Sequence, residues 1–193
     1  MAERQSHGFK FETKWCNQNN VLTWKQYEDK YGKQEGSNYT SKWDAINENK
    51  VGKHYKGRPV QLKCIGLNNA IELGDIFRNS QKEEDFTLVV GFWLGKKTNI
   101  VEIVELDIDY KKWNKLFEWD KFDEVRDWIS NKVSNERSYD EQWKTEMLHY
   151  KKLWGDRLIT PTFKRDHKKQ RRVQCQISYN TFMQEFVNNK ICK

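Results

Sequence analysis

Three polar side chains on two short segments have the types and spacing that metal-assisted hydrolysis requires. Asp44 lies in the extended segment 42–47, and Gln61 and Lys63 lie on one face of segment 58–65, which alternates as a strand does. Antiparallel pairing of the two segments would bring these side chains together. A carboxylate can hold Mg²⁺, which prefers oxygen ligands and lowers the pKa of a bound water. A nearby lysine can orient that water, so the pattern predicts phosphodiester hydrolysis with Mg²⁺ and no organic cofactor.

The two segments resemble the motif of the PD-(D/E)XK nuclease superfamily, the fold of many type II restriction endonucleases. KWDAI, with Asp44, stands in the place of the first motif strand, and PVQLKCI, with Gln61 and Lys63, in the place of (D/E)xK. The resemblance covers residues 20–108 and implies a site-specific, restriction-like endonuclease of double-stranded DNA. It implies that the Leu62 carbonyl completes the metal shell and that Lys63 assists the attacking water. It also implies a homodimer whose two-fold axis matches a palindromic DNA site.

Gln61 departs from the superfamily pattern, because an amide oxygen is a poorer metal ligand than a carboxylate. Some members take the second carboxylate from the helix after the lysine strand, and others from the helix before the first motif strand. We expect a helix over residues 70–79, on which Glu72 and Asp75 are three apart and share a face. One of these two acids is the expected ligand, with Glu35 in reserve; each could equally be a solvated helix acid.

The net charge of +7 lies entirely in residues 157–193, which hold nine basic and two acidic side chains. The remaining residues balance, with 26 basic and 26 acidic side chains. A basic segment beside a neutral body is typical of a polyanion-binding protein, although such a segment can also be a solvated surface. The side chains predicted to contact DNA, through phosphates or through base edges, are Arg78, Asn79, Lys164, Arg165, Lys168, Lys169, Gln170, Arg171 and Arg172.

Length and periodicity predict a single domain of the α/β (α+β) class, with a central mixed β-sheet flanked by helices and a restriction-endonuclease-like core. The predicted sections are a core at 20–108, a helical section at 109–156 and a basic, DNA-contacting section at 157–193. The further elements we expect are a strand at 9–15, a helix from the Thr23–Gln26 capping box to Tyr31, a buried strand at 86–94 with its hairpin partner at 100–108, helices from Tyr110 to Phe117 and from Asp120 to Val133, a helix opened by the Ser138–Glu141 capping box, a strand at 171–179 and a last helix capped by Asn180.

Composition narrows the class of protein. Aromatic residues make up 14% of the chain, with nine Trp, which is more than a disordered chain carries. No apolar run approaches the roughly 20 residues that span a bilayer, and the four cysteines form no CxxC pair. No signal-peptide apolar region follows the N-terminus, so a cytoplasmic protein without membrane contact is expected. Two alternatives stay open: a non-catalytic nucleic-acid-binding protein, and a nuclease that acts on structured DNA or RNA.

Overall fold

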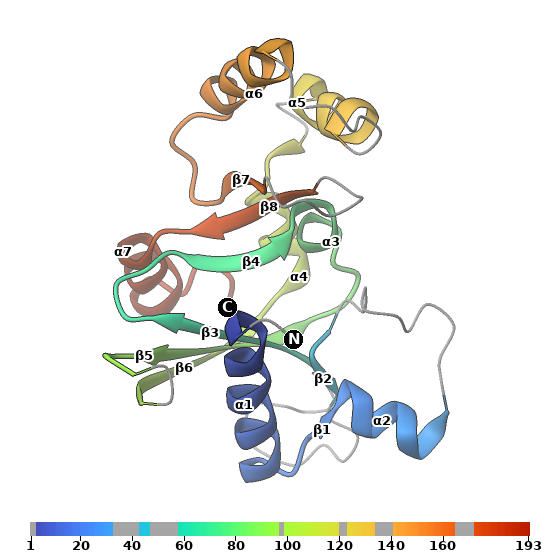
Figure 1. Cartoon of the computed structure of the whole chain (residues 1–193), viewed down its shortest axis with the longest axis vertical. Helices are drawn as coiled ribbons and strands as arrows, with labels where there is room; N and C mark the ends of the chain where they lie inside the picture. The colour runs from blue at the N-terminus through green and yellow to red at the C-terminus, as the bar shows by residue number, and fades with distance from the viewer. Residues whose placement is uncertain are drawn as a thin grey trace.

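The computed structural model describes residues 3–32, 43–46, 58–96, 99–119, 123–133, 141–164 and 172–193. These residues form a mixed α/β fold with two β-sheets (Figure 1). The strands are β1 (Leu22–Thr23), β2 (Ala45–Ile46), β3 (Pro59–Gly66), β4 (Ile71–Asp75), β5 (Phe86–Trp93), β6 (Ile100–Ile108), β7 (Thr160–Lys164) and β8 (Arg172–Ile177). The helices are α1 (Glu3–Gln18), α2 (Trp24–Tyr31), α3 (Ile76–Ser80), α4 (Tyr110–Lys115), α5 (Asp123–Trp128), α6 (Glu141–Trp154) and α7 (Tyr179–Thr181), with π-helical segments η2 (Ile129–Val133) and η3 (Phe182–Asn188).

The larger sheet has the strand order β1-β2-β3-β5-β6, and β3 and β5 are its parallel pair. The other pairs in this sheet are antiparallel, so the predicted mixed sheet is confirmed. β5 is buried along nearly its whole length and pairs with β6, as its continuous apolar run predicted. The smaller sheet has the order β4-β8-β7 and is antiparallel throughout.

Two expectations about secondary structure are wrong. The expected strand at 9–15 lies inside α1, because Phe11 and Trp15 are four residues apart and both pack on one face of that helix. The expected helix at 70–79 is β4 followed by the short helix α3. Gly74 has a φ of 102° at a bulge in β4, which a helix could not accommodate.

Two apolar clusters cover the two faces of the larger sheet. On one face, Leu88 and Val90 of β5 pack with residues of the smaller sheet and of several helices. On the other face, α1 packs on β3 and β5 through Phe11 and Trp15. A Cβ built on Gly91 of β5 would lie 2.5 Å from the Phe11 ring, so only glycine allows α1 this close to the sheet. Figure 1 shows the result, with α1 and the smaller sheet on opposite sides of the larger sheet.

The C-terminal half contains the helices that the sequence predicted and one strand that it did not. Figure 1 shows α5 and α6 together at the end of the molecule beyond β7 and β8. β7 was not expected, because its sequence TPTFK lies where only a basic segment was recognised. The last helix begins two residues earlier than expected, since the Ser178 side chain rather than Asn180 caps it. Within the described ranges, no helix is long and apolar enough to cross a membrane.

Candidate functional site

Asp44 lies immediately before β2 and faces the open edge of β3. Its backbone N–H donates a hydrogen bond to the Val60 carbonyl at 3.0 Å. Its carboxylate oxygen Oδ2 accepts the backbone N–H of Leu62 at 2.8 Å and lies 3.5 Å from the Lys63 ammonium. The structure therefore brings Asp44 and Lys63 together, as the sequence predicted. The short length of β2 makes this possible, since it pairs with β3 only at Pro59 and Val60 and leaves the following residues to the Asp44 side chain.

The Leu62 carbonyl faces the same edge. The N–H and C=O groups of one residue in a strand point to the same side, as exchanged hydrogen-bonded pairs in antiparallel sheets show. The Leu62 N–H points to Asp44, so its carbonyl is directed to that edge as well. A backbone oxygen is thus available beside the carboxylate, where the superfamily resemblance places a metal ligand.

Glu12 of α1 is the acid that sequence reasoning missed. Burial raises the pKa of the Glu12 carboxyl from 4.5 to about 7, the Asp44 charge raises it further and the Lys63 ammonium acts in the opposite direction. These interactions place Glu12 within electrostatic reach of both motif residues. A helix before the first motif strand was considered as a source of a ligand, but the interpretation of 9–15 as a strand hid this one. Helical spacing of Phe11 and Trp15 was the signal that could have revealed it.

Cys16 lies one helical turn after Glu12 and is fully buried. Burial, followed by the charges of Glu12 and Asp44, raises the pKa of the Cys16 thiol to about 12. A thiol with such a pKa stays protonated at neutral pH and is neither a nucleophile nor a metal ligand. The chemistry at this edge therefore belongs to the oxygen and lysine side chains.

Gln61 is buried, with 4% of its surface exposed, on the face of β3 that also carries Lys63. Its amide nitrogen Nε2 donates to the Leu73 carbonyl at 3.1 Å and to Asn79 Oδ1 at 3.2 Å. Its amide oxygen Oε1 is buried and accepts no hydrogen bond. Leaving a buried acceptor without a partner costs about 1–3 kcal/mol, so this oxygen calls for an explanation.

The acids expected to replace the missing carboxylate lie elsewhere. Glu72 is exposed on β4, and Asp75 caps α3 by accepting the Arg78 N–H at 3.0 Å. They do not share a helix face, because residues 71–75 form a strand rather than a helix. Glu35 lies outside the described residues. Among the residues that the structure describes, no three His, Cys, Asp or Glu side chains gather as a metal-binding group.

The predicted DNA-contacting residues are only partly described. Arg78 is half-buried on α3, whereas Asn79 is 3% exposed and its amide is directed inward, so its side chain does not face solvent. Lys164 ends β7 and is paired in register with Arg172, which begins β8. The remaining predicted contacts, at 165 and 168–171, lie outside the described residues.

The donor set at the edge of β3 fits a hard divalent cation. Mg²⁺ needs oxygen ligands, keeps several waters and is held by one or two carboxylates. Glu12 and Asp44 supply two carboxylates, the Leu62 carbonyl supplies a third type of oxygen and the orphaned Gln61 Oε1 supplies a fourth. Comparison of the chain with known protein families, with curated proteins and with solved structures found no match in any of the three.

Proposed function

We propose that this protein is a Mg²⁺-dependent endonuclease that hydrolyses phosphodiester bonds of double-stranded DNA. The observation that carries the proposal is the meeting of two carboxylates and one lysine at the edge of β3. Asp44 Oδ2 lies 3.5 Å from Lys63 Nζ, and the charges of both act on Glu12. Metal-assisted phosphodiester hydrolysis requires acids to hold the cation and a cationic group near the reacting phosphate.

Each residue of the chain has a separate task in this proposal. Glu12 and Asp44 hold the cation, and the Leu62 carbonyl and Gln61 Oε1 complete the protein ligands. Mg²⁺, when bound, lowers the pKa of a water molecule and offsets charge on the phosphate. The Lys63 ammonium, beside Asp44, orients the attacking water and stabilises the negative phosphate oxygens.

The arrangement of strands supports a restriction-endonuclease-like core as part of the proposal. β2 and β3 are antiparallel neighbours that carry Asp44 at the start of one and Gln61 and Lys63 within the other. β3 then runs parallel to β5, with α1 packed against both strands. The motif residues therefore lie on adjacent strands of one mixed sheet, as the PD-(D/E)XK resemblance implies.

The charge of the chain supports a nucleic-acid substrate. The surplus of +7 lies after residue 156, while the acids of the proposed site lie in the neutral part of the chain. A polyanion would be held by the first part and cut by the second, since phosphate contacts position a substrate without participating in its chemistry. Cleavage of both strands at a palindromic sequence would use a homodimer.

The test is cleavage of supercoiled plasmid DNA with Mg²⁺, comparing the wild-type protein with Lys63→Ala and with Lys96→Ala, a lysine remote in sequence from the motif. We expect wild type and Lys96→Ala to cut and Lys63→Ala to bind DNA in a gel shift without cutting it. Discrete fragments would indicate a site-specific enzyme, and cutting of junctions or RNA alone would change the substrate. DNA binding with no cleavage by the wild-type protein would instead favour the non-catalytic alternative.

A further inference from the structure

The orphaned oxygen of Gln61 has a fixed direction, because the hydrogen-bond pattern around it permits only one orientation of two amides. Asn79 Nδ2 donates to the backbone carbonyls of Asp75, at 2.8 Å, and Leu73, at 3.2 Å. Carbonyl oxygens only accept hydrogen bonds, so the nitrogen of Asn79 must face them and its oxygen must face the other way. That oxygen then receives the Gln61 amide at 3.2 Å.

Gln61 is oriented in turn. Both hydrogens of its Nε2 are used, one by the Leu73 carbonyl and one by Asn79 Oδ1. A flipped Gln61 amide would place its oxygen against two acceptors, and a flipped Asn79 would do the same against two backbone carbonyls. Gln61 Oε1 is therefore held on the side away from β4 and α3, with no hydrogen bond of its own.

We propose that Asn79 is a positioning residue for the proposed nuclease site, where it holds the Gln61 amide so that the oxygen rather than the nitrogen is presented to the cation beside Asp44. This inference rests on the proposed function, because it assigns Oε1 a metal as its missing partner. Asn79 itself contacts neither metal nor substrate. Outer partners that orient a ligand commonly change metal affinity by 10–100-fold when removed.

The same contacts explain why a glutamine stands at a position where the resemblance implies an acid. A glutamate at 61 would place a carboxylate oxygen near the Leu73 carbonyl and Asn79 Oδ1, which are both acceptors. Two acceptors without a hydrogen between them repel each other, so the local backbone and Asn79 select an amide. Gln61→Glu is then expected to weaken rather than strengthen metal binding, although it adds a negative charge.

The first experiment measures the affinity of the full chain for Mn²⁺ by calorimetry, with Asn79→Ala compared with Asn114→Ala. Asn114 is the matched control, since its amide also bonds to backbone groups, at 3.0 and 2.7 Å from Lys82 N and O, outside the proposed site. We expect about tenfold weaker Mn²⁺ binding for Asn79→Ala and an unchanged affinity for Asn114→Ala. Equal affinities in wild type and Asn79→Ala would overturn the role of Asn79.

A double variant separates positioning from general damage to the fold. Because Asn79 acts only through Gln61, Gln61→Met and Gln61→Met/Asn79→Ala should bind Mn²⁺ equally weakly. A further loss in the double variant would show that Asn79 affects the site by another route, which overturns the proposal.

The second measurement uses the wild-type protein, so it does not depend on whether variants fold. Nuclear magnetic resonance follows the Gln61 side-chain amide, assigned by its absence in Gln61→Met, while Mg²⁺ is added. We expect the Gln61 nitrogen and the Leu62 backbone amide to shift together. A shift of Leu62 alone would overturn the role of Asn79 and leave the nuclease proposal standing. No shift of either would overturn the metal site, and the role of Asn79 with it.

Discussion

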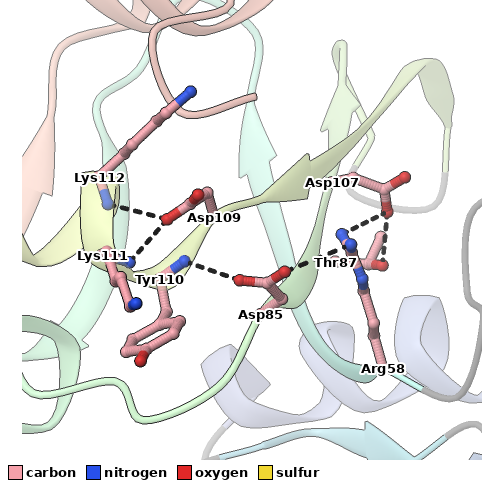
Figure 2. A network of polar contacts seen from close by, with 8 residues as sticks. All are labelled: Arg58, Asp85, Thr87, Asp107, Asp109, Tyr110, Lys111 and Lys112. Carbon is pink, nitrogen blue, oxygen red and sulfur yellow. Dashed lines mark hydrogen bonds and ion pairs between the residues drawn. The ribbon is translucent and has the colours of Figure 1, made fainter.

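Two clusters on the larger sheet have the same ingredients, one basic side chain beside two acids, but differ in how the acids are satisfied. In the first, at the start of β3 and β5, Arg58 lies 3.3 Å from Asp85 and 3.8 Å from Asp107. Figure 2 shows that each of these acids has a further donor, the Tyr110 N–H for Asp85 and the Thr87 hydroxyl for Asp107. This cluster ties strand ends to α4 and leaves its carboxylates committed.

The second cluster, Glu12, Asp44 and Lys63, is balanced differently. Its lysine pairs with Asp44, while burial and the Asp44 charge raise the pKa of Glu12 to about 7. An unpartnered amide oxygen lies on the same strand face as the lysine. Perturbed acids and orphaned polar atoms are typical of functional sites, whereas satisfied ion pairs are typical of structural ones. The comparison therefore teaches that satisfaction of hydrogen bonds, and not residue type, distinguishes the two clusters.

The largest expected difference between the clusters is in catalysis. Glu12→Gln should lower the rate of plasmid cleavage by about 100-fold, because the amide holds the cation less well than the carboxylate. Asp85→Asn, the matched change in the structural cluster, should leave the rate within about twofold of wild type. Single-turnover cleavage at saturating protein measures both, and similar rates for the two variants would remove the distinction.

The second prediction concerns pH. Since Glu12 must lose its proton to bind a cation, the apparent Mn²⁺ affinity should fall by up to about tenfold per unit as pH drops below about 7. Above that pH the affinity should level off. Calorimetry from pH 5.5 to 8.5, values chosen to bracket the pKa by about 1.5 units on each side, measures this slope. Glu12→Gln should bind weakly with a flatter profile, and an equal slope in both proteins would assign the proton to another group.

Without metal, the same group makes stability depend on pH with the opposite sense. The folded protein holds the Glu12 proton more tightly than the unfolded chain, whose carboxyl has the ordinary pKa of 4.5. The contribution of Glu12 to the free energy of unfolding is therefore complete below about 4.5 and is lost as pH rises through about 7. Urea unfolding of wild type and Glu12→Gln should show the variant gaining stability relative to wild type over this range.

The third prediction tests how the functional cluster is positioned. Gly91→Ala places a Cβ 2.5 Å from the Phe11 ring, so α1 must shift away from β5. We expect a loss of about 1–3 kcal/mol in the free energy of unfolding and weaker Mn²⁺ binding, since Glu12 follows Phe11 on α1. Gly95→Ala is the control: no atom lies within 4 Å of its Cβ, although a φ of 70° gives it strain of its own. A Gly95→Ala variant with the same loss of metal affinity would contradict this explanation.

The smallest expected effect belongs to the structural cluster. Arg58→Met should lower the free energy of unfolding by about 1 kcal/mol, because the ion pairs of Arg58 are partly exposed and screened by solvent. Mn²⁺ affinity should not change. A measured change in metal affinity, by calorimetry at equal salt concentration, would show that the two clusters are coupled through β3.

Local periodicity predicted the elements whose pattern admits one interpretation. β5 is apolar throughout, β3 alternates Val60, Leu62 and Cys64 toward α1, and the Thr23–Gln26 capping box opens α2 with both of its hydrogen bonds present. Helix boundaries in the second half were near those expected, for example α4 from Tyr110. In each case the signal lies within a few residues of the element that it specifies.

Local pattern was insufficient where two periods fit the same residues. Phe11, Thr13 and Trp15 alternate as in a strand, yet Phe11 and Trp15 also have the four-residue spacing of a helix. The segment from Ile71 to Asp75 was equally ambiguous, and β8 resolved it by pairing with it. Tertiary packing decided both, because hydrogen-bond partners and buried surfaces come from segments far away in the chain.

The candidate site divides along the same line. The sequence by itself determined that Asp44 and Lys63 would meet, since both lie on segments whose strand character and pairing follow from local alternation. Only the tertiary structure decided that Glu12 joins them and that Glu72 and Asp75 do not, because those outcomes depend on α1 packing against Gly91 and on β4 pairing with β8. Alternation acts between neighbours in sequence, whereas charge, burial and orphaned hydrogen-bond groups act between neighbours in space.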